Sequence, residues 1–177
     1  MTDRPHITPT NYKRKGAAKL MSYMNKNNAT LRNRVGQKMP PEEQQEFMHK
    51  SDYHEFTRGY VISPKKNDLT DEEMQEAVRD SITDYFDGES VDFCYAIHDP
   101  EKVREESDEL HAHVAITGTE DDLRMDKDDI RGFNQQSEEV FQQVEREYEI
   151  LRKLKRTEEL EEELEEEQEL EWEQALH

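Results

Sequence analysis

The sequence predicts an α+β fold in which a central antiparallel sheet carries flanking helices and a long acidic helix follows at the C-terminal end. Three runs rich in β-branched, aromatic and apolar residues, 56–63, 91–98 and 110–117, are typical of strands of one sheet. A capped amphipathic segment after residue 70 and a glutamate-rich segment with a thin apolar stripe are typical of helices. The 177 residues fit one domain with an appendage, and a charged fraction of 38% requires part of the chain to stand in water.

The first 40 residues contain an arm and one helix. Residues 1–15 are polar and include Pro5 and Pro9, so we expect a flexible basic arm there. Residues 16–27 predict a helix because apolar side chains recur at helical spacing, at Ala17, Leu20, Met21 and Met24. After Pro40 a short helix is expected over 41–49, since proline is tolerated in the first turn of a helix.

The middle of the chain predicts the sheet and its most clearly marked helix. The strand over 56–63 stops at Pro64, and Thr70 with Glu73 forms a capping box that starts a helix. An apolar stripe continues this helix to Phe86. The runs VDFCYAIH (91–98) and LHAHVAIT (110–117) predict two further strands, joined by an acidic loop over 99–109.

From about residue 126 onward the pattern is mostly helical, with an interruption expected at Gly132. Its first half carries enough apolar side chains to pack on the sheet, whereas the stripe thins among glutamates beyond Arg156. We therefore divide the chain into an arm over 1–15, a central domain over 16–135 and a C-terminal helix with an acidic tail over 136–177.

Charge is distributed unevenly along the chain. The formal net charge is −20, which alone argues against a nucleic-acid partner because phosphates are repelled by such a field. Residues 1–38, however, hold nine basic side chains against one acid, whereas residues 157–177 hold eleven glutamates and no Lys or Arg. The basic N-terminal region is therefore the expected contact for phosphate, and the tail is expected to be a solvated segment or a contact for an accessory protein.

The composition also restricts the compartment and the kinds of metal site. No run approaches the roughly 18 consecutive apolar residues of a membrane span, and the start MTDRPHITPT lacks the apolar stretch of a signal peptide, so we expect a soluble cytoplasmic protein that contacts no membrane. One cysteine, Cys94, excludes an intramolecular disulfide and a cysteine-rich zinc site. A metal ion would need histidine and carboxylate ligands.

The strongest chemical signal is His111-Ala112-His113 within a predicted strand. Side chains alternate along a strand, so both imidazoles lie on one face of the sheet. His98 ends the preceding predicted strand, and antiparallel pairing would bring it close to the histidine pair. Three imidazoles with open coordination positions are typical of a divalent metal site that acts on phosphate or carbonyl oxygen, although isolated sheet histidines often have no such role.

A metal-assisted reaction at phosphate also needs a nucleophile, and the basic first helix offers Tyr23. Lys19 and Lys26 flank it, and nearby cations favour the phenolate and bind phosphate. Tyrosines between methionines are commonly packing residues, however. Tyr148, on the helix after the histidine strand, is the alternative nucleophile.

The order of GAAKLMSYMNK, TRGYVISP, LTDEEMQEAVRDSITDYF, YAIH and LHAHVAITG resembles the relaxase (mobilisation protein) family of HUH endonucleases over about residues 16–135. The resemblance implies an HUH-type catalytic domain that nicks and religates single-stranded DNA by tyrosine transesterification, on a plasmid or another mobile element. It implies a metal site at His98, His111 and His113, holding Mg²⁺ or Mn²⁺, and Tyr23 as the nucleophile. Replication-initiator and transposase relatives place the tyrosine after the histidines instead, at the position of Tyr148.

Single-stranded DNA, with or without a hairpin, is therefore the expected partner. We expect its backbone to be held by Lys19, Lys26, Arg32 and Arg34. Two alternatives stay open: a DNA-binding or assembly protein with this fold that does not cut, and a metal-dependent hydrolase of another kind.

Overall fold

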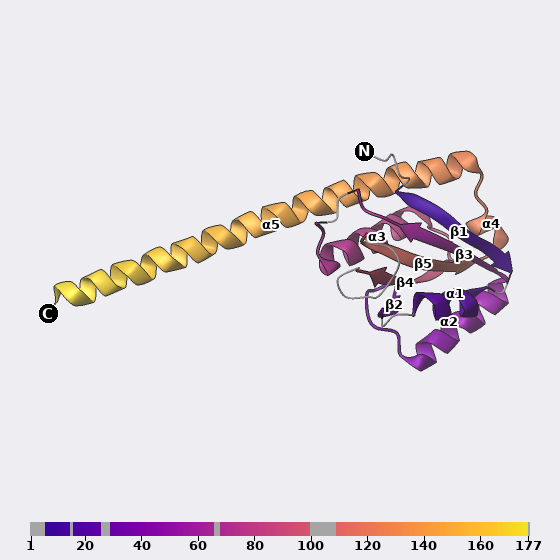
Figure 1. The fold of residues 1–177 in the computed structure, drawn as a ribbon, viewed down its shortest axis with the longest axis horizontal. Helices are drawn as coiled ribbons and strands as arrows, with labels where there is room; N and C mark the ends of the chain where they lie inside the picture. Colours follow the sequence, from indigo (N-terminus) through magenta and orange to yellow (C-terminus); the bar gives the residue numbers. More distant parts are fainter. Residues whose placement is uncertain (1–5, 15, 26–28, 66–67, 100–108, 177) are drawn as a thin grey trace.

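A computed structural model describes residues 6–14, 16–25, 29–65, 68–99 and 109–176, and it is an α+β fold (Figure 1). Five antiparallel strands form one sheet in the order β1-β3-β5-β4-β2. The strands are β1 (Ile7–Arg14), β2 (Arg32–Asn33), β3 (Phe56–Ile62), β4 (Asp92–His98) and β5 (His111–Gly118). The helices are α1 (Ala17–Met24), α2 (Pro41–His54), α3 (Asp71–Tyr85), α4 (Glu120–Leu123) and α5 (Lys127–Ala175).

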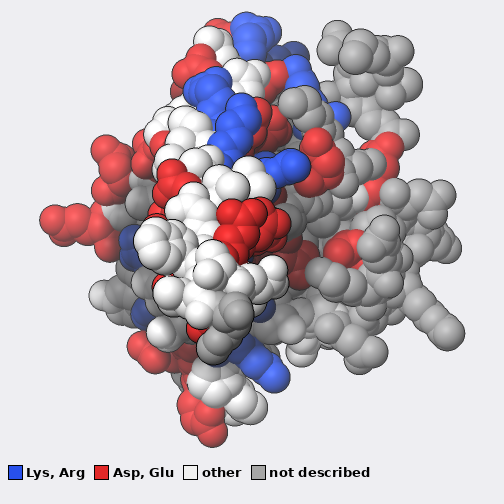
Figure 2. Space-filling model, turned by 90° about the vertical axis from the view of Figure 1, so that its left-hand side faces the viewer, with Lys and Arg blue, Asp and Glu red and all other residues white. Residues whose placement is uncertain are grey.

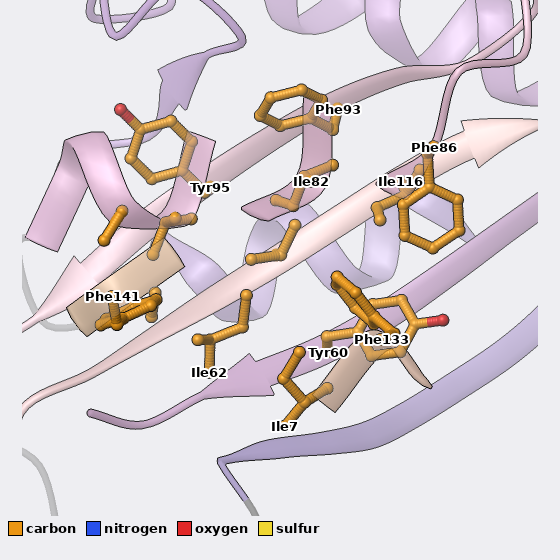
Figure 3. Packing of buried hydrophobic residues seen from close by; sticks show 14 of the residues in the cluster. Ile7, Tyr60, Ile62, Ile82, Phe86, Phe93, Tyr95, Ile116, Phe133 and Phe141 are labelled. Atoms are coloured by element: carbon orange, nitrogen blue, oxygen red, sulfur yellow. The ribbon is translucent and has the colours of Figure 1, made fainter. Parts of the chain in front are cut away.

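Each face of the sheet is covered by a different pair of helices. Alternation along β5 sends Ala112, Val114 and Ile116 toward α3 and α5, where they join a large apolar cluster. Figure 3 shows part of this cluster, in which Phe133 of α5 lies beside Tyr60 of β3. The opposite face, with Ala115 of β5, packs against α1 and α2. The odd-numbered residues of β5, including both histidines, therefore lie on the α1 face.

The prediction of a flexible arm over 1–15 is wrong for residues 7–14, which form β1 at the edge of the sheet. β1 pairs only with β3, and its register shifts between Pro9 and Asn11. An edge strand with a bulge tolerates a proline, because one side of the strand needs no ladder hydrogen bonds. His6 and Ile7, at the beginning of this segment, are buried. Residues 1–5 lie outside the described part of the chain.

The predicted helix after residue 70 and the three predicted strands are confirmed within one or two residues. Thr70 and Glu73 form the expected capping box at the start of α3. Two short elements, β2 and α4, were not predicted, and α2 runs five residues further than expected, to His54. Its additional turn buries Ser51, whose hydroxyl lies 2.6 Å from that of Thr57.

α5 is one continuous helix of 49 residues, so the interruption expected at Gly132 is wrong, and the boundary expected between 135 and 136 falls inside this helix. Asp126 caps the helix by accepting hydrogen bonds from the backbone N–H groups of Asp128 and Asp129. Its first half packs on α3 and the sheet, and its second half projects away from the domain (Figure 1). Phe133 is fully buried, and the Tyr85 hydroxyl donates to the carbonyl of Asp129, so contacts on both sides of Gly132 support the helix at a residue that alone would weaken it.

Candidate metal centre

The three predicted histidines lie together on the α1 face of the sheet. β4 and β5 pair in a register that sets His98 opposite His111 and Ala96 opposite His113. One ring nitrogen from each histidine can be chosen so that all three lie within 4.8 Å of one another. The prediction that antiparallel pairing brings His98 to the histidine pair is confirmed. We refer to His98, His111 and His113 as the histidine triad.

The triad is buried, and its rings are in mutual contact. His98 is 1% exposed, and the other two are each 7% exposed. Ring centroids are 4.6 Å apart for His98 and His113, and 4.9 Å apart for His111 and His113. Buried imidazoles this close together can turn nitrogen atoms toward one ion, and the neutral imidazole is the form that ligates metal ions.

Backbone carbonyls define which nitrogens of two triad rings carry hydrogen. The Nε2 atom of His98 lies 3.1 Å from the carbonyl oxygen of Met24, and Nδ1 of His111 lies 2.8 Å from that of Glu109. A carbonyl oxygen only accepts hydrogen bonds, so each of these nitrogens is the donor. The lone pairs are then on Nδ1 of His98 and Nε2 of His111. Such second hydrogen bonds from ring N–H groups are typical of metal-ligating histidines.

The donor set therefore fits a metal ion. The Nε2 atoms of His111 and His113 are 3.2 Å apart. Nitrogens that share one ion at about 2.0–2.1 Å are separated by about 3.0–3.4 Å. The sequence did not identify the carbonyls of Met24 and Glu109, because a backbone group carries no residue-specific signal.

Tyr23 lies beside the triad. α1 buries Ala17, Leu20, Met21 and Met24 against the sheet, and Tyr23 is on the remaining, outward face. Its ring meets that of His113 edge to face, with centroids 5.1 Å apart and planes at 88°. The side chain of Tyr23 is 46% exposed. One side of the phenol thus contacts a triad residue, and the side chain is about half exposed to solvent.

The basic residues predicted to hold DNA are only partly brought to this place. Lys19 is exposed and lies four residues before Tyr23, on the same face of α1. Lys26 lies outside the described residues. Arg32 pairs with Tyr95 across β2 and β4, and its guanidinium donates to the carbonyl of Gly36.

Arg34 lies still further from the triad. It lines a hollow of about 300 Å³ together with Lys50 and Asp92, at the beginning of β4. His98 is at the opposite end of that strand, six residues or about 20 Å away. That Arg32 and Arg34 hold the DNA backbone stays a prediction, and it would require the DNA strand to run along β4 from the triad.

Tyr148 is on the other face of the sheet. It packs against the cluster beneath α3 and α5, and its hydroxyl donates to Glu76 at 2.8 Å. This hydrogen bond to a carboxylate raises the pKa of Tyr148 to about 12, which keeps the phenol protonated. The alternative assignment of the nucleophile to Tyr148 does not agree with its placement, because the sheet separates it from the triad.

Comparison with known proteins identifies no relative: no protein family, curated protein or solved structure matches the chain. Among the described residues, no helix has both the length and the apolar composition needed to cross a membrane. The assignment of function therefore depends on the residues of the site themselves.

Proposed function

We propose that this chain is a metal-dependent endonuclease that nicks and religates single-stranded DNA, with Tyr23 as its nucleophile. The observation that carries the proposal is the contact between Tyr23 and His113, which joins an exposed phenol to a buried three-histidine site. The resemblance of the sequence to relaxases of the HUH class points to the same reaction.

The proposed reaction is a reversible transesterification. The Tyr23 hydroxyl loses its proton to solvent, and its oxygen forms a bond to the phosphorus of the scissile phosphate. The bond from phosphorus to the 3′ oxygen of the neighbouring nucleotide breaks, and that oxygen takes up a proton from solvent. The products are a 5′-phosphotyrosine and a 3′ hydroxyl. Attack of this hydroxyl on the phosphotyrosine rejoins the strand.

The chain's own groups would position the substrate for this step. The imidazoles of His98, His111 and His113 would hold a divalent ion, which supplies charge neutralisation at a phosphate oxygen when bound. Imidazole ligands favour Mn²⁺ over Mg²⁺, because Mg²⁺ takes oxygen ligands in preference. Lys19, one turn before Tyr23, is placed to pair with an adjacent backbone phosphate.

A covalent-adduct assay tests the proposal. We expect the protein, incubated with a pool of labelled single-stranded oligonucleotides and Mn²⁺, to give a band on a denaturing gel that is shifted by the protein's mass. Tyr23→Phe should abolish this band while retaining DNA binding. Tyr53→Phe is the matched control, because Tyr53 is 83% exposed on α2 and contacts His54 edge to face rather than the triad.

Two results would reassign the function. An adduct that persists in Tyr23→Phe would remove Tyr23 as the nucleophile. The second candidate is a DNA-binding protein that holds the metal without cutting. It would be favoured if the wild type binds Mn²⁺, His113→Gln does not, and no oligonucleotide in the pool gives an adduct. That candidate is favoured by the depth of the triad, whose members are at most 7% exposed.

A further inference from the structure

The projecting half of α5 carries apolar side chains on a face that the described part of the chain leaves uncovered. At 100° per residue, four of these side chains fall within about 80° of the helix surface, whereas the exposed Leu151, Leu160, Leu170 and Leu176 lie outside this arc. We call the four the apolar stripe: Ile150, Leu154, Leu164 and Trp172, which are 56%, 57%, 56% and 73% exposed. The residues by which α5 packs on the domain lie on another side of the helix: Phe141 is about 180° and Val144 about 120° from Ile150. The stripe is therefore a second surface rather than a continuation of the core.

Charge along the same helix is divided into two blocks. The basic block, 152–156, holds Arg152, Lys153, Lys155 and Arg156, whereas the acidic block, 158–173, holds eleven glutamates and no cation. Figure 2 views the molecule from the side toward which α5 projects, where Lys and Arg side chains lie among Asp and Glu side chains. Eight pairs of these glutamates are spaced four residues apart, and each such like-charge pair destabilises an isolated helix by about 0.2–0.5 kcal/mol. The acidic block would be stabilised by a basic partner.

We propose that this partner is the α5 helix of a second copy of the chain, packed antiparallel and centred between Leu160 and Glu161. The numbers of two residues that face each other across the pair then add up to about 321, so that Thr157 of one copy faces Leu164 of the other. The basic block of each copy runs alongside residues 165–169 of the other, which include Glu165, Glu166 and Glu169. A parallel pair in register would instead place the two acidic blocks together.

The antiparallel register also brings apolar side chains together. It places residues 148–156 of the second copy beside residues 165–173. The apolar stripe of one copy then meets that of the other, because Ile150 comes beside the turn that contains Trp172.

The two domains do not compete for space in this arrangement. Residue 149 of one copy lies beside residue 172 of the other, so the domains are separated along the helix pair by about 23 residues, or roughly 35 Å. This association is independent of the proposed nuclease activity, since the triad is on the far side of the sheet from α5.

Sedimentation velocity on the full chain tests the association. We expect a species of twice the 21.1 kDa chain mass that becomes a smaller fraction of the protein as salt is raised. The triple variant Lys153→Glu, Lys155→Glu, Arg156→Glu should be monomeric. It leaves the contact between Arg152 and Glu73 in place, so the packed half of α5 is preserved. Lys127→Glu, on the same helix outside the paired blocks, should remain dimeric.

Disulfide cross-linking tests the direction and register. The only natural cysteine, Cys94, is buried and does not interfere. A mixture of Thr157→Cys and Leu164→Cys chains should form a cross-linked dimer on oxidation, whereas each variant alone should not, because identical positions are about 10 Å apart along the axis. Self-cross-linking of either variant alone would overturn the antiparallel arrangement. A monomer at every protein concentration would overturn the association itself.

Discussion

The imidazole of His6 is buried at the entrance to β1. It is 3% exposed, its Nε2 atom lies 3.1 Å from the hydroxyl of Ser137 on α5, and its ring contacts Phe141 edge to face. The hydroxyl of Ser137 in turn donates to that of Ser81 on α3. Burial lowers the pKa of His6 from 6.5 to about 4, against an opposing effect of Glu138. The native protein therefore holds this histidine neutral.

The stability of the fold should consequently fall as the pH is lowered from 6.5 toward 4. In this window His6 takes up a proton in the unfolded chain and stays neutral in the native protein. Protonation therefore lowers the free energy of the unfolded state alone, and the free energy of unfolding decreases. The expected loss from this residue between pH 7 and pH 5 is about 2 kcal/mol. Urea unfolding at the two pH values measures it.

His6→Gln separates this effect from those of other groups. Glutamine can still hydrogen bond to Ser137 but does not titrate, so the variant should lose less stability than the wild type over the same pH range, by about 2 kcal/mol. His49→Gln, an exposed change on α2, should behave as the wild type does. Equal pH dependence of His6→Gln and wild type would show that His6 titrates over the same pH range in the native and unfolded states.

The sequence predicted the members of the metal centre better than their surroundings. His111 and His113 share a face because strand side chains alternate, and the length of β4 brings His98 opposite them. The Nε2 donor of His98 bonds to Met24, 74 residues earlier, and His6 bonds to Ser137, 131 residues later. Contacts of this kind depend on how α1 and β1 meet the sheet, and no local pattern encodes them.

At the scale of elements, the first half of α5 is part of the domain rather than an appendage. Phe133 is fully buried, and its ring lies 4.7–5.3 Å from those of Tyr60, Tyr85 and Phe86. These partners come from β3, the end of α3 and the residue after it. The aromatic cluster therefore joins α5 to two elements that lie far from it in the sequence.

Phe133→Ala should destabilise the whole fold rather than only the helix. Removing a fully buried phenylalanine costs about 3–5 kcal/mol, through lost burial and the cavity left behind. Thermal or urea unfolding followed by circular dichroism should show one transition at lower temperature or urea concentration. Leu151→Ala, at a residue of the same helix that is 56% exposed, is the control and should change stability by less than about 1 kcal/mol.

A second, independent transition in Phe133→Ala would contradict this view of α5.

The sequence could predict α3, because Thr70 and Glu73 mark its start and one run of apolar side chains follows. It could not predict β1, whose pattern contains Pro9 and few apolar residues, because an edge strand gains its order from its neighbour. β2, with two residues, is too short for any periodicity.

For the whole molecule, the net charge of −20 opposes the binding of DNA at the triad. The eleven glutamates of residues 157–177 supply more than half of this charge, and the side chains described there are exposed. They form no part of either apolar cluster. The tail can therefore be altered without disturbing the sheet or the metal centre, and its charge acts on a polyanion through the long-range field.

Deleting residues 157–177 should accordingly tighten the binding of single-stranded DNA at low salt while leaving the unfolding transition of the domain unchanged. The deletion changes the net charge from −20 to −9, because the segment contains eleven glutamates and no Lys or Arg. Fluorescence anisotropy with a labelled oligonucleotide should show the largest gain in affinity at the lowest ionic strength, where the Debye length is longest.

A full-length chain with all eleven of these glutamates changed to glutamine distinguishes charge from the mere presence of the segment. It should reproduce the tighter binding of the deletion, since it removes the same charge and keeps the helix. Both variants should converge on the wild-type affinity as salt is raised, because screening removes the field of the tail but not the contacts at Lys19 and the triad. A gain in affinity that is seen only in the deletion, or that persists at high salt, would mean that the segment occludes the DNA site by direct contact.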